Sequence, residues 1–252
     1  MEEHILFLGT GSGFSTLPNT ILLLNYRNSR ILIDFGFTGL RQLRVNKISP
    51  DTIDALIITH MHSDHIGGIE MLSYILKFQF KKKLLIILPH FEFQFMLWDA
   101  LKNSMKFSIH GVMQMSDYFD VMIARRANKV SNLRFKSHNF TFIKTKHIPG
   151  MLSFGVVFSM NNKRVFYTSD MVFDPELLLF VNKKYTPSLI IHDCKTDSAE
   201  EGVHATYKQL RTLPQKLKRK MLLIHYDDNF LELNPEQDGF IGFARTGEYI
   251  IP

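Results

Sequence analysis

The chain has 252 residues, of which 45% are hydrophobic and 21% charged, a composition that excludes an intrinsically disordered or low-complexity protein. No apolar run approaches the ~20 residues that a membrane-spanning helix needs, so we expect no membrane partner. The start of the chain lacks the basic region of a signal peptide, and Cys194 is the only cysteine. These features favour a cytoplasmic protein without an internal disulfide, and we expect one domain over residues 1–252.

The formal net charge of +6 favours a partner that carries phosphate. The basic side chains are dispersed apart from two dense runs, at residues 81–83 and 216–220. Each run precedes an apolar, strand-like stretch, where charges typically mark the solvated end of an element. A long nucleic acid is therefore a partner only under an alternative considered below.

The first elements are predicted from apolar runs and turn residues. Ile5–Leu8 is predicted as a strand, and the glycine-rich turn at 9–13 lets the backbone approach another group closely. Its spacing differs from a dinucleotide-binding fingerprint, which excludes a Rossmann site. Thr20–Leu24 and Arg30–Asp34 are predicted to form a hairpin, and Phe37–Lys47 a helix. Asp34, at the end of its strand, is expected to hold the histidine loop described next through hydrogen bonds.

The segment Thr59-His60-Met61-His62-Ser63-Asp64-His65 follows Ala55–Ile58, which is predicted to be a short buried strand. Three histidines and an aspartate therefore leave the end of a core strand together, and a loop can fold them onto one point. Imidazole and carboxylate are ligands that suit zinc, and manganese is also compatible. Two neighbouring divalent ions are predicted.

The division between the two ions follows from the spacing. His60 and His62, two residues apart on an extended strand end, can bind one ion. Asp64 and His65, on the turn, can bind the other.

The middle of the chain is predicted to continue with helix, strand and helix at residues 71–76, 84–88 and 91–98. The aromatic side chains of the last helix are expected to pack in the core or at an interface. Tyr118 and Phe119 are predicted on a loop before a strand at 121–123, where they would stack on the base of a ligand. A packed loop is the alternative interpretation.

The second half is predicted to consist mainly of strands, at residues 140–144, 153–160, 164–167, 189–191 and 221–224. A polar metal-binding residue type follows three of them: His147, Asp170 and His225. Each alone is an ordinary polar residue. In this order behind the first motif, they complete two metal coordination shells.

These residues resemble the metallo-β-lactamase superfamily of hydrolases over nearly the whole chain. The resemblance implies an α/β fold, the αβ/βα sandwich, with two mixed sheets face to face, helices outside and the metal cleft at one edge. It implies His60, His62 and His147 as ligands of the first ion and Asp64, His65 and His225 as ligands of the second. Asp170 would be the bridging carboxylate. In such a hydrolase Asp64 and Asp170 would orient the attacking water, which makes Asp64 a candidate catalytic residue as well as a ligand.

Within the superfamily, the ribonuclease Z-like branch is similar in the opening Phe7-Leu8-Gly9-Thr10-Gly11-Ser12-Gly13 and in a late acid followed by a histidine. Here these are Asp193 and His204, and the resemblance makes His204 the proton donor to the leaving group, with Asp193 fixing its tautomer. A buried pair without catalytic duty is the alternative. The tRNA-processing members have a substrate arm and a Gly-Leu-Pro-Gly segment after the motif. This chain has neither.

The run from His192-Asp193-Cys194 through Gly202-Val203-His204 to His225-Tyr226-Asp227-Asp228 is similar to cyclic-nucleotide phosphodiesterases of the anti-Pycsar type. That resemblance implies a homodimer that hydrolyses 3′,5′-cyclic nucleotides, including cyclic CMP and cyclic UMP, in the host cytoplasm if phage-encoded. A tRNA 3′ endonuclease and a nucleotide-sequestering protein without catalysis are the alternatives. The ligand spacing alone also permits a thioesterase or lactonase.

Overall fold

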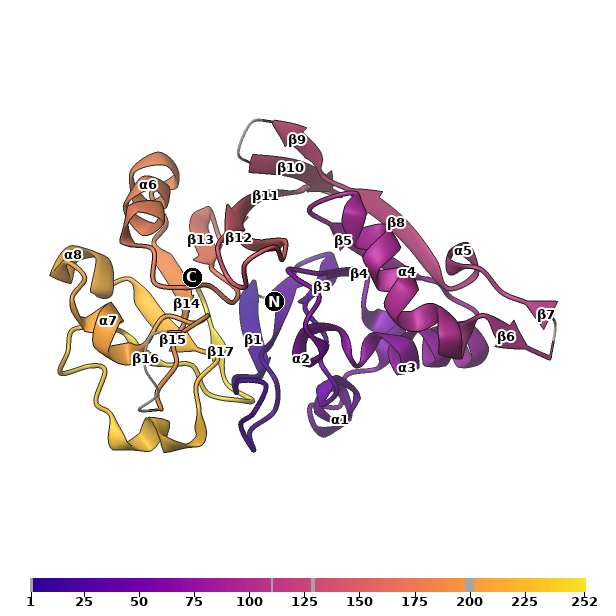
Figure 1. Ribbon diagram of the computed structural model, residues 1–252, viewed down its shortest axis with the longest axis horizontal. Helices are drawn as coiled ribbons and strands as arrows, with labels where there is room; N and C mark the ends of the chain where they lie inside the picture. Colours follow the sequence, from indigo (N-terminus) through magenta and orange to yellow (C-terminus); the bar gives the residue numbers. More distant parts are fainter. Residues whose placement is uncertain (1, 110, 128–129, 198–201) are drawn as a thin grey trace.

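The computed structural model describes residues 2–109, 111–127, 130–197 and 202–252. Two β-sheets lie face to face, and helices cover their outer faces (Figure 1). This arrangement confirms the αβ/βα sandwich expected from the sequence. Within the described ranges, no helix is both long enough and apolar enough to cross a membrane.

The first sheet has seven strands in the order β17-β1-β2-β3-β4-β5-β8. Strands β17, β1, β2 and β3 are antiparallel, and pairing becomes parallel from β3 through β4 and β5 to β8. The bounds are His4–Gly9 (β1), Ile21–Tyr26 (β2), Ser29–Ile33 (β3), Ala55–Ile57 (β4), Leu84–Leu88 (β5), Phe119–Ile123 (β8) and Tyr249–Ile250 (β17). The predicted hairpin is thus confirmed as β2 and β3.

The second sheet has eight strands in the order β16-β15-β14-β13-β12-β11-β10-β9. Strands β13 to β16 are parallel, and β9 to β13 are antiparallel. The bounds are Arg125–Ala127 (β9), Val130–Phe135 (β10), His138–Thr145 (β11), Ser153–Met160 (β12), Lys163–Tyr167 (β13), Leu189–Asp193 (β14), Met221–Ile224 (β15) and Gly242–Phe243 (β16). A small hairpin, β6 (Phe107–Ser108) and β7 (Gly111–Val112), projects from one end of the molecule (Figure 1).

Helices flank each sheet on the side away from its partner (Figure 1). Beside the first sheet lie α1 (Gly39–Val45), α2 (Ser63–Ile66), α3 (Ile69–Tyr74), a π-helical turn (Ile75–Gln79), α4 (Glu92–Met105) and α5 (Met115–Tyr118). Beside the second lie α6 (Pro175–Tyr185), α7 (Tyr207–Arg211) and α8 (Gln215–Lys218). Two 3₁₀ turns, Pro50–Thr52 and Asp228–Glu232, complete the elements.

The apolar strands of the second sheet are buried on both faces. Ile191 and Ile224 belong to the core that also contains the first sheet, whereas Ile190 and Leu223 pack in a second cluster with the residues of α6, α7 and α8. Successive side chains of a strand point to opposite faces, so each continuous apolar run supplies both clusters. This double burial explains why β14 and β15 lack the polar alternation of a half-exposed strand.

The sheets bring the predicted polar residues to one edge of the molecule. In the second sheet β11, β13, β14 and β15 run in the same direction, so their carboxyl ends share one edge. His147, Asp170 and His225 follow β11, β13 and β15, and Asp193 ends β14. Residues distant in sequence therefore meet where these strands end.

The prediction for Tyr118 and Phe119 is wrong. Tyr118 ends α5 and Phe119 begins β8, and the two side chains are only 1% and 2% exposed. Tyr118 donates a hydrogen bond from its hydroxyl to the carbonyl oxygen of Met105, 3.0 Å away. Rings buried in this way have no exposed face on which a base could stack, which agrees with the alternative interpretation of a packed segment.

Candidate metal centre

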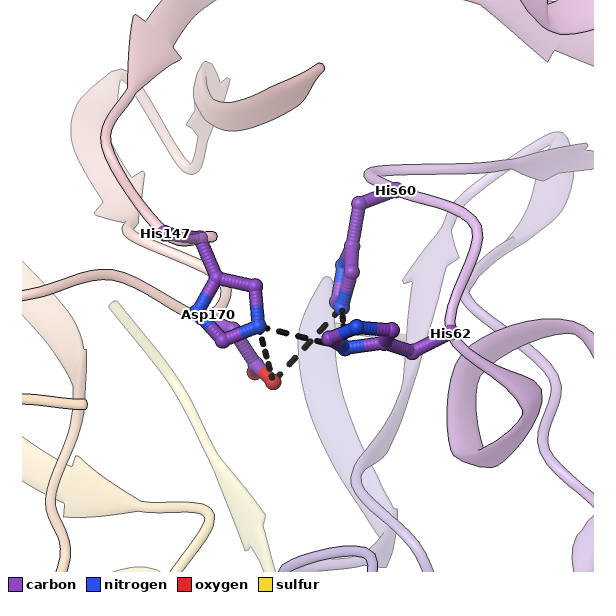
Figure 2. Close-up of side chains that lie close together, drawn as sticks. All are labelled: His60, His62, His147 and Asp170. Carbon is purple, nitrogen blue, oxygen red and sulfur yellow. Dashed lines mark hydrogen bonds and ion pairs between the residues drawn. The ribbon is translucent and has the colours of Figure 1, made fainter. Parts of the chain in front are cut away.

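His60, His62, His147 and Asp170 point toward one another (Figure 2). Nδ1 of His62 lies 3.1 Å from Nε2 of His60 and 3.1 Å from Nε2 of His147. Oδ2 of Asp170 lies 3.6 Å from the first of these Nε2 atoms and 3.9 Å from the second. A tetrahedral ion with bonds of about 2.0–2.1 Å has ligand atoms roughly 3.3 Å apart. These four side chains therefore have the spacing of one ion's ligands.

A second group shares Asp170 with the first. Nε2 of His65 lies 3.4 Å from Oδ2 of Asp64 and 3.3 Å from Oδ2 of Asp170. Nε2 of His225 is 3.3 Å from the same Asp170 oxygen and 3.9 Å from that of Asp64. One carboxylate oxygen thus faces ligand atoms of both groups. The geometry suits two neighbouring cations with Asp170 between them.

Two buried atoms of the cluster make no hydrogen bond to the residues that the structure describes. Within the described part of the chain, neither Nε2 of His65 nor Oδ1 of Asp170 has a hydrogen bond. A buried polar atom left unpaired costs about 1–3 kcal/mol, and more when it is charged. A bound cation removes this cost, so the residues present fit a divalent metal.

The second ring nitrogen of several of these histidines is held by another group. The contacts are His65 Nδ1 to Asp34 Oδ2 at 2.8 Å, His147 Nδ1 to the Val203 carbonyl oxygen at 2.7 Å, and His225 Nδ1 to Thr20 Oγ1 at 3.1 Å. Such contacts fix the tautomer and the orientation of the ring, and leave Nε2 free to bind a metal. This is the arrangement that metal-binding histidines require.

Asp34 connects the strand β3 to the histidine loop, as the sequence analysis expected. Its carboxylate accepts hydrogen bonds from the backbone N–H of Thr59 at 2.8 Å and from the Thr59 hydroxyl at 2.7 Å, besides that from His65. The side chain is fully buried. The Asp34 carboxylate therefore fixes both the start of the histidine loop, at Thr59, and the orientation of the His65 ring.

We expect Asp34→Asn to weaken metal binding about 10–100-fold, because the amide cannot accept all three hydrogen bonds and the His65 ring loses its anchor. Competition with a coloured chelator measures the affinity. Asp54→Asn is the matched control, since Asp54 also accepts from a backbone N–H, that of Arg30 at 2.8 Å, but lies outside the cluster. Equal affinities in both variants would contradict this role.

The electrostatics favour neutral imidazole at the first group. Burial, followed by the neighbouring imidazoles, lowers the pKa of His60, and the same two causes lower the pKa of His62. Burial also lowers the pKa of His147. Burial alone would lower the pKa of His65 too, but the carboxylates of Asp170 and Asp34 raise it well above its usual value. The first three rings are thus in the form that binds metal at neutral pH.

Four side chains of the cluster, His62, Asp64, Asp170 and His225, line an open cleft of about 460 Å³. This volume lies within the range of about 300–1,000 Å³ that small-molecule sites occupy. Phe14, Phe37, Lys195 and His204 line the same cleft. A small ligand can therefore reach both candidate ion positions.

A sequence model of the family described as "Anti-Pycsar protein Apyc1" matches residues 3–250. The chain belongs to this family. The Apyc1 of Paenibacillus xerothermodurans is 31% identical over 244 residues, covering 96% of this chain and 92% of the relative. The Apyc1 of Bacillus phage vB_BveM-Goe7 is 32% identical over 260 residues, covering 98% of this chain and 97% of the relative.

Among solved structures, the metallo-β-lactamase fold protein YhfI from Bacillus subtilis superposes with a TM-score of 0.77 at 17% identity, over 99% of both chains. This likeness confirms the metallo-β-lactamase fold. Together with membership of the Apyc1 family and the His and Asp cluster, it identifies the protein as a metal-dependent hydrolase that binds divalent metal.

In this Apyc1-family chain, His204 and Asp193 form a pair at the rim of the cleft. Nδ1 of His204 donates to Oδ2 of Asp193 at 2.8 Å, and the same oxygen accepts from the backbone N–H of Met171 at 3.0 Å. Burial alone would lower the pKa of His204, but the charge and hydrogen bond of Asp193 raise it to about 9. The carboxylate of Asp193 thus favours the protonated imidazole, the form that a general acid needs.

The same pair, together with His225, also has the spacing of a metal site. The ring of His204 stacks on that of His225 with centroids 5.1 Å apart. The two roles require different protonation states of His204. A proton donor must carry a proton, whereas a metal ligand must have an unprotonated nitrogen facing the metal. Measurement of the metal content of a variant separates the two roles.

Sequence reasoning did not identify Phe14, Phe37 and Lys195 as cleft residues. A signal for the two aromatic side chains exists, because each follows a glycine that packs against Asp64. A Cβ atom on Gly13 would lie 2.9 Å from Oδ2 of Asp64, and one on Gly36 would lie 1.9 Å from its carbonyl oxygen. In the glycine-rich turn, Gly13 therefore makes its close approach to the histidine loop, whereas a Cβ atom on Gly9 would lie 1.9 Å from the carbonyl oxygen of Asn19. For Lys195 the sequence carries no local signal.

Proposed function

We propose that this protein is a binuclear metal-dependent phosphodiesterase that hydrolyses 3′,5′-cyclic nucleotides, including cyclic CMP and cyclic UMP, to nucleoside monophosphates. It would thereby counter Pycsar antiphage signalling, in keeping with the printed name of its relatives. The observation that carries the proposal is the convergence of seven candidate metal-binding side chains at one small cleft, which His204 also lines.

The proposed ligands come from both halves of the chain. The first ion would be held by His60, His62 and His147, the second by Asp64, His65 and His225, with Asp170 shared. Nitrogen and carboxylate donors at tetrahedral spacing suit Zn²⁺, and Mn²⁺ is compatible with the same set. Because both sheets contribute to one cluster, we treat residues 1–252 as one functional domain.

Divalent cations bound at the cluster would lower the pKa of a water and offset the negative charge of a phosphodiester. Asp64 lines the cleft, and its carboxylate would orient the attacking water. As the water oxygen bonds to phosphorus, the bond from phosphorus to a sugar oxygen breaks, and His204 donates a proton to that oxygen. Asp193 holds Nδ1 of His204, so Nε2 carries the transferable proton.

The direct test is to incubate metal-replete protein separately with cyclic CMP, cyclic UMP, cyclic AMP, cyclic GMP and a tRNA precursor with a 3′ trailer. Products are separated by chromatography. We expect linear monophosphates from the cyclic substrates and no trailer cleavage. His62→Ala and a chelator-treated sample are the controls, and both should lose the activity, because each removes part of the cation-binding cluster.

The other outcomes identify the alternatives. Trailer cleavage with intact cyclic nucleotides would assign a tRNA 3′ endonuclease. Stoichiometric recovery of unchanged nucleotide from a stable complex would assign a sequestering protein. We also propose that the protein acts in the cytoplasm, which is the host cytoplasm if a phage encodes it. We further propose that it is a homodimer. Light scattering of the same preparation tests the dimer.

A further inference from the structure

Phe14 stands at the rim of the cleft with its side chain entirely in solvent, at 102% exposure. Single exposed apolar side chains are common on protein surfaces, so exposure alone indicates nothing. The position is what distinguishes this ring. It follows Gly13, which packs against the carboxylate of Asp64, one of the proposed metal ligands.

The turn that carries Phe14 is tied down on both sides. Before it, the backbone N–H of Ser12 donates to the carbonyl oxygen of Tyr226 at 3.0 Å, and the Ser12 hydroxyl donates to Asp227 at 2.9 Å. After it, the hydroxyl of Ser15 and the backbone N–H of Thr16 both donate to the carboxylate of Asp228.

The residues that hold the turn, 226–228, directly follow His225, another proposed ligand. The turn is therefore anchored to the metal cluster on two sides, through Asp64 and through the segment after His225. The backbone that carries the Phe14 ring is thus held in a fixed place relative to the cluster, so a ligand does not have to order the turn. Little conformational entropy is then lost on binding.

Phe37 is a second aromatic ring on the wall of the same cleft, and it is 56% exposed. Its Cδ1 atom lies 2.6 Å from the place that a Cβ atom on Gly67 would occupy. The absence of a side chain at Gly67 therefore lets part of the ring rest on the backbone at the end of α2, while the rest stays open. Gly36, before it, packs on the backbone of Asp64.

We propose that Phe14 and Phe37 form a nucleobase-binding subsite, in which the base of the substrate stacks on Phe14 while its cyclic phosphate lies over the metal cluster. This inference rests on the proposed function and specifies which part of the substrate the rim recognises. Stacking is available to every base, because every base has a π-face. The subsite therefore provides affinity for nucleotides of either base class.

The test compares cyclic UMP with methyl riboside 3′,5′-cyclic phosphate, which has the same reacting group but no base. For Phe14→Ala, the ratio of kcat/KM for cyclic UMP to that for the baseless substrate should fall about tenfold or more, since stacking on an aromatic ring has about that effect on affinity. The loss should be mainly in KM. Phe14→Tyr, which keeps a ring, should retain the wild-type ratio.

Phe95→Ala is the matched control, because Phe95 is 63% exposed on α4 and does not line the cleft. It should leave the ratio unchanged. If Phe14→Ala and wild type hydrolyse cyclic UMP normally and have the same ratio of kcat/KM for cyclic UMP to that for the baseless substrate, the subsite is overturned but the proposed function is not. Equal losses on both substrates, with a change of oligomeric state, also overturn it and make Phe14 a contact between copies. Wild-type protein that leaves both substrates intact overturns the proposed function and the subsite together.

Discussion

Asp170→Asn is expected to lower kcat by at least about 10³-fold and to reduce the metal bound per chain. The reason is the shared position of this carboxylate. Its Oδ2 lies 3.3 Å from Nε2 of both His65 and His225 and 3.6 Å from Nε2 of His60. The amide keeps the shape but loses the negative charge that faces both candidate ions. Both ion positions are therefore weakened by one substitution.

Metal content measured by mass spectrometry, alongside cyclic UMP hydrolysis, checks this result. Asp120→Asn serves as the control, because Asp120 is a solvent-exposed carboxylate in β8 whose partner is Lys83, 3.7 Å away. It should retain both metal and activity. Normal metal content and turnover in Asp170→Asn would show that the carboxylate does not lie between two cations.

His204→Ala is expected to cut turnover by about 10²–10⁴-fold while the metal content stays at the wild-type level. The ring lines the cleft, and its Nδ1 is bound to Asp193, so its loss removes the proton donor but none of the seven proposed ligands. Asp193→Asn should act in the same direction with a smaller effect, because the histidine remains but its tautomer is no longer fixed.

Metal analysis of the same samples decides between the two roles that the geometry permits for His204. Loss of metal together with activity would make it a ligand, as its spacing to His225 allows. Unchanged turnover would remove it from the mechanism. His90→Ala is a suitable control, because His90 precedes α4 and is not among the cleft residues.

Local sequence pattern was sufficient for much of the fold. Leu84–Leu88 has the predicted bounds, and the strands β1, β2, β3 and β11 to β15 lie where apolar runs placed them. Short apolar runs of this kind are buried on both faces, so their identity as strands does not depend on which strand lies beside them. The two-residue strands β16 and β17 were not predicted, because only their pairing with β15 and β1 makes them strands.

The prediction for Tyr118 and Phe119 failed for a related reason. Polar neighbours in Ser116-Asp117-Tyr118-Phe119-Asp120 are typical of an exposed loop. Asp117 instead caps α5 by accepting from the backbone N–H of Gln114 at 2.7 Å, which satisfies the polar groups locally. The two rings then turn into the core. Their burial depends on α4 and β5, which the local pattern cannot place.

The sequence by itself determined which residue types stand at the ends of buried strands, and therefore that histidines and carboxylates would gather around a metal. Only the tertiary structure decided which of them meet. Asp34 reaches His65 across 31 residues because β3 and β4 are neighbours in the first sheet, whereas Thr20 reaches His225 across 205 residues because the two sheets pack against each other. The periodicity of apolar residues along the sequence predicts on which face of a strand or helix a side chain lies. Contacts between distant segments depend on how the two sheets pack, and that packing also placed Phe14 beside the cleft.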